Sequence, residues 1–177
     1  MKGLLIAIAA MAGVIGLSNY AVQFAMNDWL TWGALTYPVA FLVTDLTNRA
    51  AGPVKARRVV YAGFALGVAL SLWLADWRIA AASGSAFLIA QLLDIAVFDR
   101  LRRQTWWKAP LASSLAGSAV DTALFFSLAF AGTGLPWVTW ALGDFAAKLA
   151  MAILLLGPFG VLRRILPSMS VERAIRA

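Results

Sequence analysis

Six long apolar stretches separated by short polar connections restrict the fold of this chain more than any other feature. They span residues 3–26, 31–48, 59–75, 79–98, 110–131 and 137–162. A helix needs about 20 apolar residues to cross the roughly 30 Å hydrocarbon core of a bilayer. Hydrophobic residues make up 62% of the 177 residues and charged residues only 13%, and a soluble domain of this size cannot bury so much apolar surface. Isolated strands cannot satisfy their backbone in lipid. The sequence therefore predicts an all-α integral membrane protein, a single domain with six transmembrane helices.

The basic residues predict which way these helices run. Thirteen of the fifteen Lys and Arg residues fall on one side of a six-helix topology. They are Lys2, Arg49, Lys55, Arg57, Arg58, Arg100, Arg102, Arg103, Lys108, Arg163, Arg164, Arg173 and Arg176. Arg78 alone falls on the other side, and Lys148 lies inside the last stretch. Because basic loops stay inside the cell, we expect both termini, including the tail at 163–177, to be cytoplasmic. The net charge of +7 is then a topology signal that suits anionic lipid headgroups, and we expect no nucleic-acid partner.

The residues that are missing exclude several kinds of chemistry. The chain has no cysteine and no histidine, so thiolate catalysis, cysteine-held metals and Ser-His triads are excluded. It also lacks a Gly-rich phosphate loop of the Gly-x-x-x-x-Gly-Lys-Ser/Thr type. We expect no catalytic residue, no metal and no cofactor. A membrane enzyme or assembly factor without a transported substrate remains a minor alternative.

Ionisable side chains inside the apolar stretches are the strongest functional signal. Such a group costs about 2.5–3.5 kcal/mol at the bilayer centre, and it therefore should face the helix bundle and have a partner. The charged ones are Asp45, Asp94, Asp121, Asp144 and Lys148, and the amides are Asn19, Gln23, Asn48 and Gln91. Four carboxylates face one ammonium, so protons, loop arginines or a cationic ligand must neutralise the excess. A polar track of this kind is typical of a transporter rather than of a simple anchor.

Spacing and depth group these residues. Asp144 and Lys148 are four residues apart, so they can pair on one helix face, either as a helix-locking ion pair or as part of a substrate site. At about 1.5 Å per residue, Asp121 and Lys148 come near the midplane. Asp45 and Asp94 come within about two turns of the basic loops. Ion pairs with Arg49, Arg57 or Arg100, which we call the arginine clasp, and contact with a ligand are about equally expected there. Pro38 can kink or break the second stretch, either for packing or to line a transport site.

The same polar positions carry a family resemblance along nearly the whole chain. They include Ser18-Asn19-Tyr20 with Gln23, Thr31-Trp32-Gly33-Ala34, Tyr37-Pro38, Thr44-Asp45-Leu46-Thr47 with Arg49, Arg78-Ile79-Ala80, Gln91 with Leu93-Asp94, Arg100-Leu101-Arg102, Trp106-Trp107, Asp121-Thr122, Phe125-Phe126, Asp144 and Lys148. In these residues the chain resembles the queuosine precursor transporter family, a bacterial branch of the vitamin uptake transporters. Asp99, where the family pattern has asparagine, is a departure at the end of a stretch.

The resemblance implies a six-helix carrier of the bacterial inner membrane that imports 7-deazaguanines. The substrates would be 7-cyano-7-deazaguanine, the 7-aminomethyl analogue or queuine, moved by a secondary carrier or facilitator. A substrate-binding subunit of an ATP-driven, multi-component importer is the alternative. The candidate substrate contacts are Asp121, Asp144, Lys148, Asp45, Gln91, Asp94, Asn19 and Gln23, with Phe41 and Phe125 as stacking rings and Arg78 at the outer mouth. We expect these groups to converge on one aqueous cavity that fits a planar heterocycle, and we expect a homodimer because six helices make a small bundle.

Overall fold

The computed structural model describes residues 2–24, 26–27, 29–74 and 77–166, and this part of the chain folds into eight helices without a strand. The helices are α1 (Lys2–Ala21), α2 (Gly33–Thr36), α3 (Val39–Ala51), α4 (Pro53–Leu74), α5 (Trp77–Leu101), α6 (Lys108–Phe130), α7 (Trp137–Leu154) and α8 (Leu156–Ile165). Five of the helical stretches are long and apolar enough to cross a membrane, with α7 and α8 taken together as one. The expectation of an all-helical, multi-pass membrane protein is confirmed in this respect.

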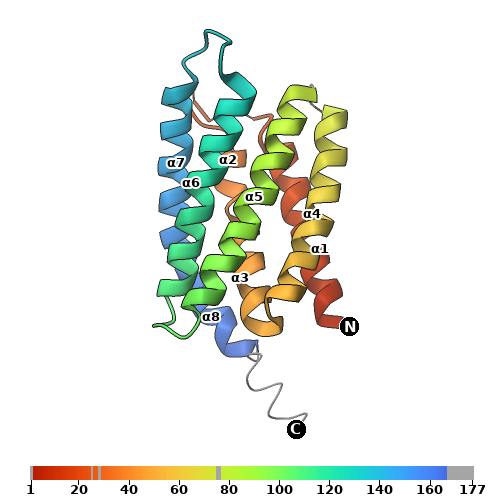
Figure 1. Cartoon of the computed structure of the whole chain (residues 1–177), viewed down its shortest axis with the longest axis vertical. Coiled ribbons are helices and arrows are strands. Elements are labelled where there is room, and N and C mark those ends of the chain that lie inside the picture. The colour runs from red at the N-terminus through yellow and green to blue at the C-terminus, as the bar shows by residue number, and fades with distance from the viewer. Residues whose placement is uncertain (1, 25, 28, 75–76, 167–177) are drawn as a thin grey trace.

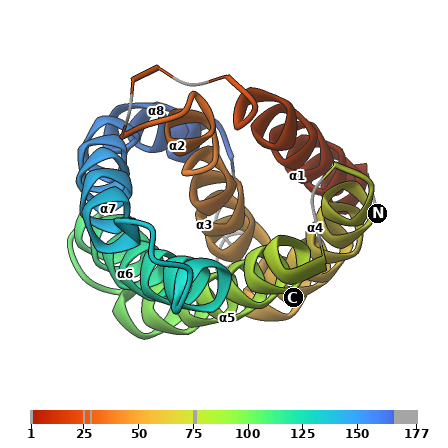
Figure 2. The same ribbon diagram turned by 90° about the horizontal axis from the view of Figure 1, so that it is seen from above.

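The long helices stand side by side with their axes along the length of the molecule (Figure 1). Seen from above, α1, α4, α5, α6 and α7 surround a middle position that α2 and α3 occupy (Figure 2). Helix α3 packs against α1, α4, α5, α6 and α8, while α2 packs against α1 and α7. One half of the bundle is apolar, since Met11, Ile15, Val59, Val60 and Phe87 form a buried cluster between α1, α4 and α5. The buried polar residues lie mainly on α3, α5, α6 and α7.

The second apolar stretch is not one continuous helix. Tyr37 and Pro38 keep helical backbone angles, but regular helical hydrogen bonding stops between α2 and α3 because Pro38 has no backbone N–H to donate. The N–H groups of Ala40 and Phe41 donate to carbonyls three residues back, those of Tyr37 and Pro38. Helix α3 has 13 residues, which span only about 20 Å. Gly33 lets this segment approach the end of α1 closely, since a Cβ there would lie 2.9 Å from the Cβ of Val22.

Two other helix boundaries differ from the apolar stretches in the sequence. Helix α4 begins at Pro53 rather than at 59, because Lys55, Arg57 and Arg58 are exposed on its first turns and do not interrupt helical hydrogen bonding. The last stretch is divided at Leu155 into α7 and α8. Pro158 has no N–H for the carbonyl of Leu154, so the regular helix stops there.

The basic segments gather at one end of the bundle. The N-terminus of α1, the turn between α3 and α4, the connection between α5 and α6, and α8 all lie at the lower end in Figure 1. The connection between α6 and α7 lies at the opposite end, where α4 and α5 also meet. The start of α1 and the end of α8 therefore lie on the same side of the bundle (Figure 1).

Candidate functional site

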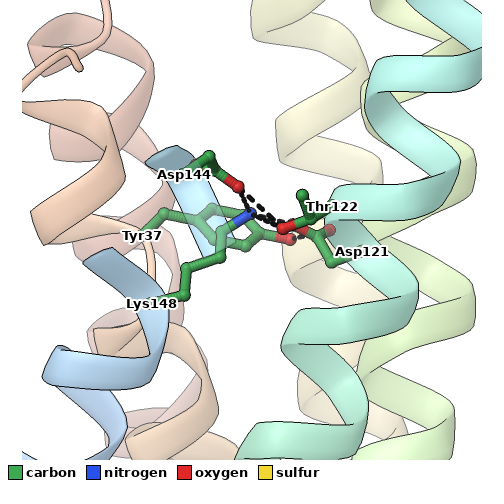
Figure 3. A network of polar contacts seen from close by, with 5 residues as sticks. All are labelled: Tyr37, Asp121, Thr122, Asp144 and Lys148. Carbon is green, nitrogen blue, oxygen red and sulfur yellow. Dashed lines mark hydrogen bonds and ion pairs between the residues drawn. The ribbon is translucent and has the colours of Figure 1, made fainter. Parts of the chain in front are cut away.

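Five side chains in the middle of the bundle form one continuous polar network, which we call the central network (Figure 3). Its members are Tyr37, Asp121, Thr122, Asp144 and Lys148. The Nζ atom of Lys148 donates to Asp121 Oδ2 at 2.7 Å and to Thr122 Oγ1 at 3.1 Å, and it pairs with Asp144 Oδ2 at 2.5 Å. Tyr37 Oη donates to Asp121 Oδ1 at 2.9 Å, and Thr122 Oγ1 donates to Asp144 Oδ2 at 2.7 Å. The four members on α6 and α7 therefore each contact at least two others, and Tyr37 is bound to the network through Asp121.

Three chain segments bring the central network together. Helix α6 carries Asp121 and Thr122, and the neighbouring helix α7 carries Asp144 and Lys148 one turn apart on the same face. Tyr37 comes from the break between α2 and α3, and its ring centre lies 5.4 Å from Lys148 Nζ. The broken second segment thus supplies both a hydroxyl donor and an aromatic face to a site that the two long helices frame.

Burial strengthens the interactions between the charged groups of the central network. Lys148 is only 4% exposed and Asp121 only 5%, so water screens their interactions little and the ion pairs replace lost hydration. One ammonium faces two carboxylates, which leaves a net charge of −1 when all three groups are ionised. The network can offer a ligand carboxylate acceptors, an ammonium donor and a tyrosine ring in one place.

A second polar cluster lies closer to the basic end, where Asp45 and Asp94 form a buried acidic pair. Asp45 is 1% exposed and Asp94 is fully buried, and the two carboxyl groups are close enough to interact electrostatically. Ser113 Oγ donates to Asp45 Oδ1 at 3.1 Å, whereas among the described residues no hydrogen bond is formed to either oxygen of Asp94. In the described residues neither carboxylate has an arginine partner, so the arginine clasp is not formed here.

Phe41 separates the two clusters. It follows Tyr37 by one turn and precedes Asp45 by one turn, is 1% exposed, and meets the Tyr37 ring edge to face at 6.2 Å between ring centres. Gly117 on α6 makes room for it, because a Cβ at that position would lie 2.6 Å from Phe41 Cε1. The ring is thus in place beside the central network, but it is already almost fully buried.

The expected shared cavity is not formed in this conformation. The central network is closed by direct contacts among its own members. A cavity beside Asp45, lined also by Ser114 and Phe159, holds about 10 Å³, which is the space of about one water molecule. Ligand pockets usually hold about 300–1,000 Å³, so a heterocycle can enter only after the helices move. No cluster of three potential metal ligands occurs among the residues that the structure describes.

The other expected site residues lie outside the central network. Gln91 Oε1 accepts a hydrogen bond from Thr44 Oγ1 at 2.6 Å, close to the acidic pair, and its Nε2 has no hydrogen-bond partner in the part of the chain that the structure describes. Asn19 donates to the carbonyl of Ile15, and Gln23 donates to the carbonyl of Asn19. Phe125 packs edge to face against two other rings, those of Phe126 and Phe130.

Arg78 belongs to the opposite end of the bundle and has a structural contact there. Its Nε donates to the carbonyl of Leu128 at 2.9 Å, and its Nη2 donates to the carbonyl of Ala131 at 2.7 Å. These are carbonyls at the C-terminal end of α6, which have no helical partner of their own. Arg78 therefore ties the start of α5 to the end of α6.

Two members of the central network, Tyr37 and Thr122, were not among the candidate contacts from the sequence. Their side chains carry no charge, so the insertion cost that singled out the other groups does not apply to them. A signal exists in both cases, because Tyr37 precedes the helix-breaking Pro38 and Thr122 follows Asp121 directly.

Most of the chain is similar to proteins of known families. The family described as "Putative vitamin uptake transporter" matches residues 31–77 and 73–162. A "Probable queuosine precursor transporter" of Haemophilus influenzae is 35% identical over 86% of this chain and 83% of its own length. The "Queuosine precursor transporter" of Escherichia coli is 36% identical over the same shares of the two chains. No solved structure matches the chain significantly.

Proposed function

This chain belongs to the vitamin uptake transporter family, and from that premise we propose that it carries queuosine precursors across the bacterial inner membrane. The substrates are 7-deazaguanines: 7-cyano-7-deazaguanine, 7-aminomethyl-7-deazaguanine or queuine. The chain works as a secondary carrier or facilitator. The single observation that supports this function best is the central network, a buried set of convergent donors and acceptors in a protein similar to named transporters.

The chemistry of the central network suits a guanine-like ring. Such a ring has two adjacent N–H donors on one edge, and a carboxylate accepts from base amines in this way. Asp121 and Asp144 are the proposed acceptors. The ring carbonyl needs a donor, which Lys148 supplies, and the flat face needs an aromatic side chain, for which Tyr37 and Phe41 lie nearest.

The closed network also suggests how binding and movement are connected. Lys148 occupies the carboxylates that the substrate needs, so the ammonium must give up part of its contacts when the ring enters. A substrate donor edge replaces those contacts, which keeps the buried carboxylates paired. The breaks at Tyr37–Pro38 and at Leu155 are the places where the helices can bend, and broken helices are common at transport sites.

The proposed orientation follows from the basic end of the bundle. The α2–α3 segment completes six crossings, and the end that carries Arg49, Arg102 and Arg163 faces the cytoplasm.

Two copies form a homodimer through small-residue faces of the helices. Asn19, Gln23, Gln91, Asp45, Asp94, Phe125 and Arg78 are proposed contacts along the path, before or after the central network.

Uptake by the purified chain tests the function. Reconstituted in liposomes without any other protein, it should accumulate or equilibrate labelled 7-aminomethyl-7-deazaguanine. Flat uptake by the chain alone, together with uptake once an ATPase and a coupling protein are added, would instead assign it to an ATP-driven importer.

Two conservative variants test the site. Asp121→Asn and Asp144→Asn should each reduce uptake at least tenfold while the protein still reaches the membrane, because one lost charge-assisted contact removes about 1.5–3 kcal/mol. Asp99→Asn is the matched control, since this carboxylate is partly exposed and pairs with Arg102 at 2.8 Å far from the network. Wild-type uptake in both network variants would remove the central network from the function.

A further inference from the structure

Several arginines meet at the basic end of the bundle with too few acceptors. The guanidinium groups of Arg102 and Arg163 are close enough to Arg49 to repel its charge. Asp99 pairs with Arg102, which also donates to the carbonyl and the side-chain oxygen of Asn48 at 2.9 and 2.7 Å. Among the described residues, only one of these three guanidinium groups, that of Arg102, pairs with a carboxylate.

Two of these arginines have buried nitrogens that lack an acceptor. The Nε atoms of Arg49 and Arg163 are covered from solvent, and within the described part of the chain no hydrogen bond reaches either of them. Buried polar groups are nearly always hydrogen-bonded in native proteins. These two positive charges are therefore not balanced by a hydrogen-bonded acceptor at Nε, and a negatively charged group at this end of the bundle would balance them.

An open groove lies beside this arginine group. It holds about 270 Å³ and is lined by Trp106, Gly157, Gly160, Val161, Arg163 and Arg164 with Leu156. Its walls are mainly apolar, and Trp106 and Val161 are 40% and 60% exposed. The Arg163 guanidinium lies over the Trp106 ring at 4.7 Å, which fixes the charge at the edge of an apolar channel.

The backbone of α8 is adapted to this groove. A Cβ at position 160 would lie 3.2 Å from the Trp106 ring, so glycine allows the ring to lie against the helix. A Cβ at position 157 would meet nothing within 4 Å, which means that the groove is open there. Helix α8 and the connection that carries Trp106 both lie at the lower end of the bundle in Figure 1.

We propose that this groove binds an anionic phospholipid, with the phosphate on Arg163 and Arg164 and an acyl chain along Trp106 and Val161. Arginine binds phosphate oxygens with two parallel hydrogen bonds, and basic pockets between membrane helices bind anionic headgroups. The apolar walls favour a lipid over a free anion, because an inorganic phosphate gains nothing from a tryptophan ring and a valine side chain. The site is separate from the central network and does not depend on the transported substrate.

Lipid binding to the full-length protein in detergent tests this site. Native mass spectrometry measures how many lipids bind and how tightly. Phosphatidylglycerol should bind at least tenfold more tightly than phosphatidylcholine with the same acyl chains. At about 1 kcal/mol for each basic residue at a membrane surface, the double variant Arg163→Gln/Arg164→Gln should bind phosphatidylglycerol about 30-fold more weakly. Lys55→Gln/Arg58→Gln removes the same charge from exposed positions on α4 and should weaken binding less than threefold.

A variant that leaves the charge unchanged distinguishes lipid binding in the groove from nonspecific electrostatic attraction. Gly157→Leu fills the open part of the groove and should weaken phosphatidylglycerol binding about tenfold while leaving the net charge unchanged. Equal loss in the two double variants, or unchanged binding in Gly157→Leu, would overturn the proposal in favour of diffuse attraction. Competition by millimolar inorganic phosphate would overturn it in favour of a soluble-anion site.

Discussion

Replacing the buried ammonium of Lys148 by a methionine is the most informative perturbation of stability. Lys148→Met keeps a long apolar side chain of similar shape but leaves Asp121 and Asp144 without their shared cation. The change removes three contacts of the ammonium, at 2.5, 2.7 and 3.1 Å. Tyr37 and Thr122 remain as donors and satisfy only part of the two carboxylates.

The size of the effect follows from burial. Removing one partner of a buried ion pair costs about 3–5 kcal/mol, because the other charge stays buried and uncompensated. Replacing all charged partners by neutral groups of similar volume is often close to neutral. The triple variant Lys148→Met/Asp121→Asn/Asp144→Asn should therefore recover most of the free energy of unfolding that the single variant loses, and it should still fail to transport.

Unfolding of the purified protein in mixed micelles, titrated with a denaturing detergent, measures both free energies. The single variant should unfold about 3–5 kcal/mol more easily than the wild type, and the triple variant within about 1–2 kcal/mol of the wild type. If Lys148→Met is as stable as the wild type, the ammonium is not the group that holds the two carboxylates. If the triple variant is no more stable than the single one, the loss comes from packing and not from charge.

Three further predictions concern the surroundings of the network. Asp94→Asn should raise the free energy of unfolding by about 1–3 kcal/mol, because it removes a buried charge that lies near Asp45 and has no hydrogen-bond donor within the described residues. Asp99→Asn, at a partly exposed pair, should change it by less than about 1 kcal/mol, and a loss of stability in Asp94→Asn would contradict the absence of a donor. Gly117→Ala should lower the free energy of unfolding by about 1–3 kcal/mol, because its Cβ would overlap Phe41. Gly13→Ala, with open space around it, should not lower it, and equal losses in the two variants would argue against close packing at Phe41. Pro38→Ala should allow a continuous helix through the break and slow uptake more than it weakens equilibrium binding of the substrate, and an unchanged uptake rate would show that the break is not needed for movement.

The helices that could be predicted well are those where apolar residues alone define the span. The first, fourth and fifth stretches overlap α1, α5 and α6 closely, since about 20 apolar residues admit few other structures in lipid. The helix that begins at Pro53 could not be placed from hydropathy, because Lys55 and Arg57 can remain helical while their charges reach water. The division at Leu155 depends on a single missing N–H at Pro158, which a hydropathy pattern does not register.

The site was predictable where one helix brings residues together. Asp144 and Lys148 pair as their spacing of four residues indicates, and Asp121 contacts Lys148, as their similar depth along the apolar stretches predicts. Contacts between helices could not be predicted from the sequence, because they depend on how α6 and the break at Tyr37 are oriented relative to α7. Gln91 and Asn19 could be identified as buried amides, but whether a partner is a substrate, a threonine or the backbone depends on distances that the sequence does not contain.

A structure of the protein with bound 7-aminomethyl-7-deazaguanine shows whether the central network binds the substrate. We predict that the edge of the ring carrying the N–H donors contacts Asp121 or Asp144, that Lys148 moves away from at least one of them, and that Tyr37 or Phe41 covers a ring face. A ring bound elsewhere in the bundle, with the five contacts of the central network unchanged, would contradict the account.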